Sequence, residues 1–175
     1  MSKKSELHHM FIKYKGIFDL LGLFKMMRDF IMEQGYQWDE QVVKHKVPGP
    51  SGAEDQYKWT AWKKVTEYTK FHIETYMHIW DLKEIEVVKS GKKTVMYQGR
   101  ILIRIIPMVE LDYNNRFEGS KFMLALRDWF HEYVWKHEIE DIWEDGLYYY
   151  TYKYHKAIKE YLEFESATNA AQERF

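Results

Sequence analysis

The 175-residue sequence contains no cysteine, which excludes a disulfide framework, thiolate metal ligands and cysteine catalysis. No apolar run approaches the roughly 20 residues that a membrane-spanning helix requires, so we expect no membrane span. The first nine residues are too polar for a secretory signal, and the sequence predicts a cytoplasmic protein. With 26 basic and 27 acidic residues the formal net charge is −1, so nucleic acid is not an expected partner.

The sequence also lacks the motifs that would assign a reaction. Its few serines lie outside any Gly-x-Ser-x-Gly nucleophile elbow, and no P-loop or Rossmann glycine pattern is present. We therefore predict no cofactor and favour a protein that is not an enzyme. What the sequence has in quantity is aromatic side chains, because 7 Trp, 14 Tyr and 10 Phe make up 18% of the chain. With 46% hydrophobic residues, that composition predicts an ordered domain with a sizeable core.

The N-terminal part of the chain gives strand and helix signals in turn. Residues 9–18 predict a short strand, and Asp19 is suited to cap the helix that helical spacing predicts over 20–34. Weak alternation over 36–47 predicts an edge strand. The Pro-Gly-Pro-Ser-Gly segment at 48–52 interrupts the pattern, and we interpret it as a long hairpin loop.

A long β-hairpin is the clearest structural feature of the sequence. Ser90-Gly91-Lys92 predicts its tight turn. Charged residues interrupt the alternation near residue 82 and predict a bulge, beyond which Ile85 and Val87 are expected to continue the same face. Pro107 lacks an amide donor and predicts an edge or an irregularity. Alternate apolar residues predict the face that packs on the core: Phe71, Ile73, Met77 and Ile79 before the turn, and Val95, Tyr97, Ile101, Ile103, Ile105, Val109 and Leu111 after it.

The hydrophobic period becomes helical after residue 115. Phe122, Leu126, Trp129 and Tyr133 follow at steps of four, three and four, and a second apolar line continues toward the C-terminus. This pattern predicts one bent helix or two packed helices over about residues 119–164. Whether the helix breaks at its internal glycine is left open by the sequence.

Together these segments predict an α+β fold. We expect a curved antiparallel sheet of about five strands, with an N-terminal helix and a long C-terminal helix or helix pair packed on one face. A single domain is expected over residues 9–165, preceded by a flexible N-terminus at 1–8 and followed by a polar tail at 166–175.

Two resemblances accompany this expectation. The order of strand, helix, antiparallel strands and long terminal helix resembles the helix-grip arrangement of START and Bet v1-like ligand-binding domains, which implies a sheet wrapped around the terminal helix. The stretch Tyr-Lys-Gly-Ile-Phe-Asp-Leu-Leu-Gly-Leu-Phe at 14–24, with Val-Glu-Leu-Asp-Tyr at 109–113, is similar to small uncharacterised archaeal proteins. The second resemblance implies no activity.

The face of the hairpin opposite the predicted core carries the first candidate site. Tyr76, His78 and Trp80 share even parity on one strand, and Arg100 and Arg104 share it on the other. The expected register places the arginines opposite or diagonal to the aromatic side chains, where cation–π contacts form. This face is either a recognition surface or ordinary cross-strand pairing on a solvent-facing sheet.

Five tyrosines between residues 148 and 154 form the second candidate site. They cover every side of a helix, which predicts burial on most sides, in the concave sheet or against a second copy. We place Tyr148, Tyr149 and Tyr152 in an interaction surface. The main functional hypothesis is a non-catalytic protein that self-associates, as a homo-oligomer, or docks on a protein partner through its aromatic-rich surfaces.

Two further binding functions are compatible with the sequence. One is a carrier of a small apolar molecule, held between the sheet and the terminal helix. The other is an RNA-binding module, because Lys58, Trp59, Trp62, Lys63, Lys64 and Lys70 interleave basic and aromatic side chains. The carrier hypothesis predicts a pocket wall made by Met77, Ile79, Ile103, Ile105, Trp129 and Tyr133.

A metal site is the weakest candidate. His137 and Asp141 are four residues apart and would share a helix face, from which both could ligate one divalent cation. The zinc-protease pattern needs a second histidine where Asp141 stands. Many carboxylates surround this pair, so a solvated acidic helix face is the simpler interpretation and no metal is predicted.

Overall fold

The computed structural model describes residues 3–49, 52–89, 92–117, 119–134 and 142–169. Within them the chain forms six strands and three α-helices, which confirms the predicted α+β class with an antiparallel, curved sheet. In chain order the elements are β1 (Lys3–Glu6), β2 (Met10–Phe18), α1 (Leu20–Glu33), β3 (Gln37–Gly49), β4 (Gly52–Lys64), β5 (Thr69–Lys89), β6 (Lys92–Leu111), α2 (Lys121–Trp129), a π-helical turn at Phe130–Val134, and α3 (Asp145–Asn169).

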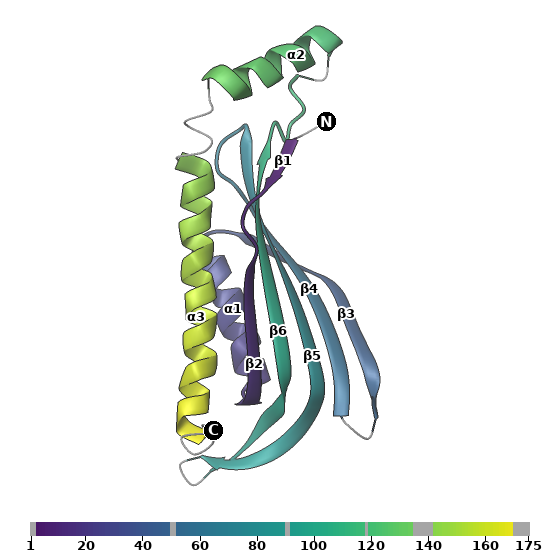
Figure 1. The fold of residues 1–175 in the computed structure, drawn as a ribbon, viewed down its shortest axis with the longest axis vertical. Coiled ribbons are helices and arrows are strands. Elements are labelled where there is room, and N and C mark those ends of the chain that lie inside the picture. The colour runs from purple at the N-terminus through teal and green to yellow at the C-terminus, as the bar shows by residue number, and fades with distance from the viewer. Residues whose placement is uncertain (1–2, 50–51, 90–91, 118, 135–141, 170–175) are drawn as a thin grey trace.

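The sheet has the order β1-β6-β5-β4-β3, and β2 also pairs with β6, next to β1. Helices α1 and α3 lie on the same face of the sheet (Figure 1). The β5–β6 hairpin curves at its tip toward the C-terminal end of α3 (Figure 1). The opposite face, which we call the outer face, carries neither α1 nor α3.

The N-terminus differs from the prediction. Residues 3–6 form strand β1, which pairs with residues 108–111 of β6, so the flexible segment expected at 1–8 is wrong over this stretch. The sheet therefore has six strands instead of about five. No local pattern marks β1, because the strand is four residues long and polar and its pairing partner lies about a hundred residues away.

The core lies between the inner face of the sheet and the two helices. Between the bulge near residue 82 and the start of β5, odd-numbered residues of β5 and their partners in β6 point inward, as the alternation predicted. The fully buried members, each at most 2% exposed, include Ile73, Met77 and Ile79 of β5, Ile101, Ile103, Ile105 and Val109 of β6, Leu23, Met27 and Ile31 of α1, and Leu147, Tyr154, Ile158 and Leu162 of α3.

Helix α1 begins and ends where the sequence predicted. Asp19 is the N-cap, and its Oδ1 accepts a hydrogen bond from the amide of Gly22 at 2.9 Å. After the helix, Gly35 adopts φ +78°, which a glycine adopts without strain and most other residues do not. The cap fixes the angle between β2 and α1, so that the apolar side chains of α1 pack on the sheet.

We expect Asp19→Ala to lower the free energy of unfolding by about 1 kcal/mol, because the Gly22 amide loses its acceptor. Asp29→Ala is the matched control, since Asp29 lies on the same helix and makes only an exposed contact with Arg28. The control should cost less than about 0.5 kcal/mol. Urea denaturation of both variants measures the difference, and equal losses would show that the cap does not stabilise α1.

A bulge in β5 confirms the predicted irregularity near residue 82. The register shifts between Trp80 and Lys83, so Asp81 and Leu82 together face Gly99 of β6. Asp81 has φ +56°, and a Cβ on Gly99 would lie 3.0 Å from the carbonyl oxygen of Trp80. The extra residue reverses the alternation, which puts Leu82 in the core.

Beyond the bulge the alternation differs from the prediction. Ile85 pairs with Met96 outside the core cluster, and Val95 is exposed where the sequence placed it in the core face. The β3–β4 connection is also shorter than the long loop expected, because Gly49 already pairs with Gly52. These differences share one cause, since the register of long hairpins depends on bulges and turns that periodicity alone does not locate.

Pro107 lies where the N-terminal segment passes from β1 to β2. Its carbonyl oxygen accepts a hydrogen bond from the amide of Leu7 at 2.9 Å. Proline has no amide hydrogen, and this position lies between the segments of β6 that pair with β1 and with β2, where the sheet needs no hydrogen bond from it. This is the irregularity that the sequence predicted for it.

The described part of the C-terminal region contains two helices, α2 and α3, and Gly146 does not interrupt α3 but lies in its first turn. Helix α3 extends to Asn169, into the predicted tail. Helix α2 buries no residue, although its apolar spacing predicted packing on the core. Figure 1 shows it beyond the end of the sheet at which β1 lies. Among the described residues, no helix has both the length and the apolar character of a membrane span.

Candidate binding site

The outer face brings five of the predicted site residues together. Tyr76 pairs with Arg104 and Trp80 pairs with Arg100, so the arginines lie directly opposite the aromatic side chains as expected. The guanidinium carbon of Arg104 lies 4.6 Å from the centre of the Tyr76 ring. The rings of His78 and Trp80 stack with centres 3.8 Å apart. The predicted parity is therefore correct over this part of the hairpin.

Neighbouring strands extend this surface on both sides. In β2 the exposed residues Phe11, Lys13 and Lys15 pair with Arg104, Leu102 and Arg100. In β4 Lys58 and Gln56 pair with Tyr76 and His78, and Lys44 of β3 pairs with Gln56. Six basic side chains of the outer face, from β2, β6, β4 and β3, border the two hollows described next. We call this set the cationic band: Lys13, Lys15, Lys44, Lys58, Arg100 and Arg104.

Two adjoining hollows lie along the cationic band. The first has a volume of about 420 Å³ and is lined by three of its cations together with the rings of Phe11, Tyr76 and His78. The second has a volume of about 450 Å³ and is lined by the other three cations, Lys13, Lys15 and Arg100, and by Trp80. Leu102 borders both hollows, and neither has a carboxylate in its lining.

Carboxylates on and around this face are already engaged. Glu74 accepts from the Tyr76 hydroxyl at 2.8 Å and pairs with Lys58 at 3.3 Å, and Asp81 accepts from Nε of Arg100 at 2.7 Å. Glu54 contacts Lys46 at 2.8 Å and His78 at 2.7 Å. Hydrogen bonds from Lys46 and then His78 lower the pKa of Glu54 to about 2, so it stays ionised and bound to these partners.

The remaining cations are not neutralised in this way. Within the part of the chain that the structure describes, Lys13, Lys15, Lys44 and Arg104 form no ion pair. Lys58 also lies over the Tyr76 ring at 5.1 Å, and its interaction with that tyrosine raises the pKa of the Lys58 ammonium. The cationic band therefore presents persistent positive charge beside aromatic rings, which is the arrangement that binds an anion with a flat or apolar part.

The upper part of the outer face is packed more tightly. His72 and Glu110 are buried and form a hydrogen bond of 2.6 Å. Burial lowers the pKa of His72 below its ordinary value, and the bond to Glu110 opposes that effect. This pair joins β5 to β6 and lines neither hollow.

The basic and aromatic run from Lys58 to Lys70 does not form one surface. Trp59 is buried on the inner face, 4.8 Å from the Phe24 ring, whereas Lys58 and Trp62 belong to the outer face. Lys70 lies over the Trp62 ring at 4.1 Å. Strand alternation puts Trp59 and Lys63 on the inner face, while Lys64 and Lys70 share the outer face with Lys58 and Trp62. Of this run only Lys58 lines a hollow, so only Lys58 belongs to the cationic band.

The tyrosine run of α3 divides between the core and the surface. Tyr154 is fully buried, and Tyr150 stacks on Tyr36 with ring centres 5.4 Å apart. The three tyrosines assigned to the interaction surface are exposed, by 36% for Tyr148, 64% for Tyr149 and 50% for Tyr152, and their burial against a second copy stays a prediction. Because α3 packs with one stripe on the inner face, they lie in the helix layer, apart from the cationic band.

The predicted pocket wall is not assembled. Met77, Ile79, Ile103 and Ile105 are in the close-packed core, while Trp129 and Tyr133 are 51% and 69% exposed beside α2. Trp129 and Tyr133 were expected to pack inward because their helical spacing was read as a core-facing stripe. Helix α2 lies beyond the sheet, and its aromatic side chains cannot close a cavity over the four aliphatic ones.

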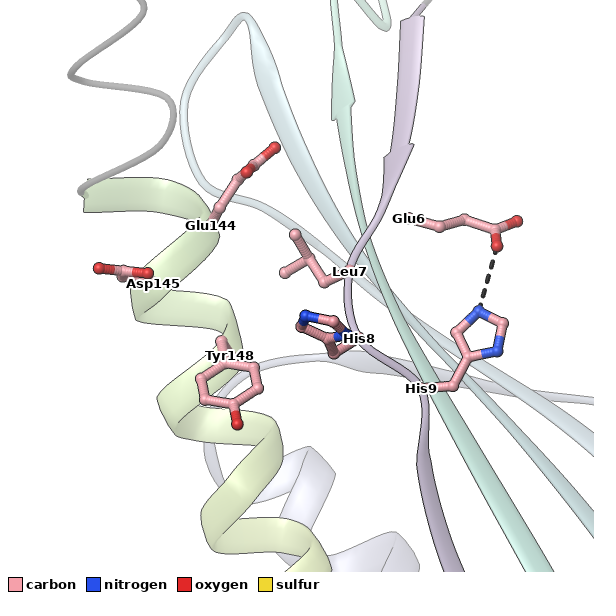
Figure 2. Close-up of a pocket in the computed structure, with 7 residues that line it drawn as sticks. All are labelled: Glu6, Leu7, His8, His9, Glu144, Asp145 and Tyr148. Atoms are coloured by element: carbon pink, nitrogen blue, oxygen red, sulfur yellow. Dashed lines mark hydrogen bonds and ion pairs between the residues drawn. The ribbon is translucent and has the colours of Figure 1, made fainter.

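His137 and Asp141 lie outside the described residues. Within the described ranges no cluster of three His, Asp or Glu side chains is placed to hold a metal ion. A hollow of about 740 Å³ between the β1–β2 connection and α3 is lined by several titratable groups, drawn in Figure 2. Those groups diverge: His8 points toward Tyr148, whereas His9 points to the other side of the strand, where it contacts Glu6 at 3.2 Å.

Sequence reasoning missed the β2 and β3 members of the cationic band. Lys13 and Lys15 alternate with the inward residues Met10, Ile12 and Tyr14, so their outward direction was readable. What the sequence did not show is that β2 pairs with β6, which places these lysines beside Arg100 and Trp80. Pairing between segments about 90 residues apart leaves no local signal.

The comparisons with known proteins add no relative. No family model matches the chain, and no curated protein matches it either.

Proposed function

We propose that the protein is a binding protein that recognises an anionic partner on the outer face of its sheet. The observation that carries this proposal is the cationic band: six basic side chains line two adjoining hollows together with aromatic rings and without a carboxylate. The backbone groups of β5 and β6 are hydrogen-bonded within the sheet. A partner would therefore be recognised by the side chains of this face.

An anionic partner fits this face better than a second copy of the chain. An isologous dimer brings the same patch of two copies together, which would put one cationic band against another. Opposed like charges cost several kcal/mol. The outer face therefore favours a partner that brings its own negative charges to the hollows, which have no carboxylate among the described residues that line them. Self-association through this face is disfavoured.

We expect the protein to be retained on immobilised heparin, a sulfated polyanion, although its formal net charge is −1. Local clusters of like charge attract polyanions even when the whole protein is nearly neutral. The double variant Lys13→Gln/Lys15→Gln should elute at a clearly lower salt concentration than the parent. These two lysines are half of the four members of the cationic band that form no ion pair within the described structure.

The matched control is Lys25→Gln/Lys159→Gln, which makes the same change in net charge at exposed positions on α1 and α3. The control should elute with the parent protein. If the parent is not retained at low salt, or if both double variants elute equally early, the outer face is not an anion-binding surface and the proposal is wrong.

A further inference from the structure

We infer that the anionic partner is a single-stranded nucleic acid that lies across the cationic band with a base stacked on Trp80. This inference rests on the proposed function and narrows its partner to one class. The inference follows from the aromatic rings, because binding of an anion alone would not require them. It also follows from the lining of each hollow, in which an aromatic ring lies beside several cations.

The hollow beside Trp80 has the parts that a nucleotide needs. His78 stacks against the Trp80 ring at 3.8 Å and supports it in one orientation. Lys13, Lys15 and Arg100 line the same hollow, with Tyr14, Ile101 and Leu102. Arg100 is paired with Asp81, so the charge free to meet a phosphate beside the ring is that of the two lysines. A base stacks on an indole ring through its flat face, while the phosphate on either side of the base meets lysine or arginine.

The neighbouring hollow continues the same pattern. Arg104, Lys58 and Lys44 follow one another along its lining, with Phe11 exposed at its edge. The cationic band spans four strand spacings, or about 19 Å at about 4.8 Å each. Stacked nucleotides rise by about 3.4 Å, so the band has room for several nucleotides instead of one.

Other polyanions match the surface less completely. A duplex presents phosphates but keeps its bases paired and stacked, so it would use the cations and leave Trp80 unused. An acidic peptide would also satisfy the charges without a flat ring to place on Trp80. The even charge balance of the chain argued against nucleic acid, but it averages over the whole molecule. Lys13, Lys15, Lys44 and Arg104 nevertheless lie together on one face.

The test is fluorescence anisotropy with labelled oligo(dT) and oligo(U) of about 12 nucleotides, alongside a duplex and a polyglutamate peptide of similar length. We expect single strands to bind more tightly than duplex or peptide. With four unpaired cations engaged, log K should fall with log salt at a slope of about −3, which the Lys13→Gln/Lys15→Gln pair should reduce by about 1.4. The two oligonucleotides distinguish DNA from RNA as the source of the strand.

Trp80 provides the decisive variant. Trp80→Leu should weaken single-strand binding at least about fivefold, while Trp80→Phe, which keeps a ring, should retain most of the affinity. The melting temperature and circular dichroism spectrum of both variants show whether the sheet is intact. If Trp80→Leu unfolds the protein, the Trp80→Phe variant and the salt slope of the parent still decide the question.

The outcomes separate the two proposals. Binding to heparin and polyglutamate without preferential binding to single strands would overturn the nucleic-acid inference and leave the anion-binding function standing. Equal affinity for duplex and single strand, unaffected by Trp80→Leu, would overturn it as well. Failure to bind heparin, peptide and oligonucleotide alike would overturn both proposals.

Discussion

Ile103→Ala is expected to lower the free energy of unfolding by about 2–5 kcal/mol, the range for removing an aliphatic side chain from a close-packed core. Ile103 is fully buried and pairs with the buried residues Ile12 of β2 and Met77 of β5. The adjacent Leu102 points to the outer face, where it borders both hollows. Leu102→Ala should therefore cost less than about 1 kcal/mol.

Chemical denaturation of the two variants measures both values under one set of conditions. They are a matched pair because they remove similar side chains from neighbouring positions on opposite faces of β6. A loss for Leu102→Ala as large as that for Ile103→Ala would mean that the outer face is covered. In that case the cationic band would not be available to any partner.

This pair of residues also shows what periodicity predicts well. Alternation between Ile101 and Ile105 assigns inner and outer faces correctly, because in a strand successive side chains point to opposite sides. The same argument assigns Tyr76, Trp80 and Arg104 to one outer surface, where the structure has them. Half of the candidate site was thus predictable from local pattern alone.

The other half depends on contacts between distant segments. Lys13 and Lys15 reach the site only because β2 pairs with β6, and Lys44 only because β3 lies beside β4. The bulge at Asp81 reverses the alternation beyond Trp80, which no count of alternating residues reveals. Register and strand order are properties of the folded sheet. The sequence therefore predicts which residues belong to each strand, but not which strands lie next to one another.

Helix α2 shows the opposite error, because the helix itself was predicted correctly but its apolar side does not pack on the core. Its apolar spacing is that of a core-facing helix, and the helix forms where predicted, yet Phe122, Trp129 and Tyr133 remain exposed in the described structure. A row of aromatic side chains along a helix shows that this side of the helix can pack against another element. Whether another element lies against it depends on the rest of the fold.

Arg104→Ala is expected to weaken binding of heparin or of a single-stranded oligonucleotide at least tenfold. Arg104 lies in the middle of the outer face, between Phe11 and Tyr76, and forms no ion pair within the described residues. Arginine at the centre of a binding surface is among the residue types whose truncation costs about 2 kcal/mol or more of binding free energy. Its contact with the Tyr76 ring should contribute only about 0.5–1 kcal/mol to folding stability.

Affinity and melting temperature measured on the same preparation separate these two effects. Arg28→Ala is the control, since Arg28 is an exposed arginine on α1 with a single weak contact to Asp29. Arg104→Lys should recover part of the affinity, because it restores the charge without the planar guanidinium. A large fall in melting temperature with unchanged affinity would show that Arg104 is a structural residue, and the centre of the proposed binding surface would then have to lie elsewhere.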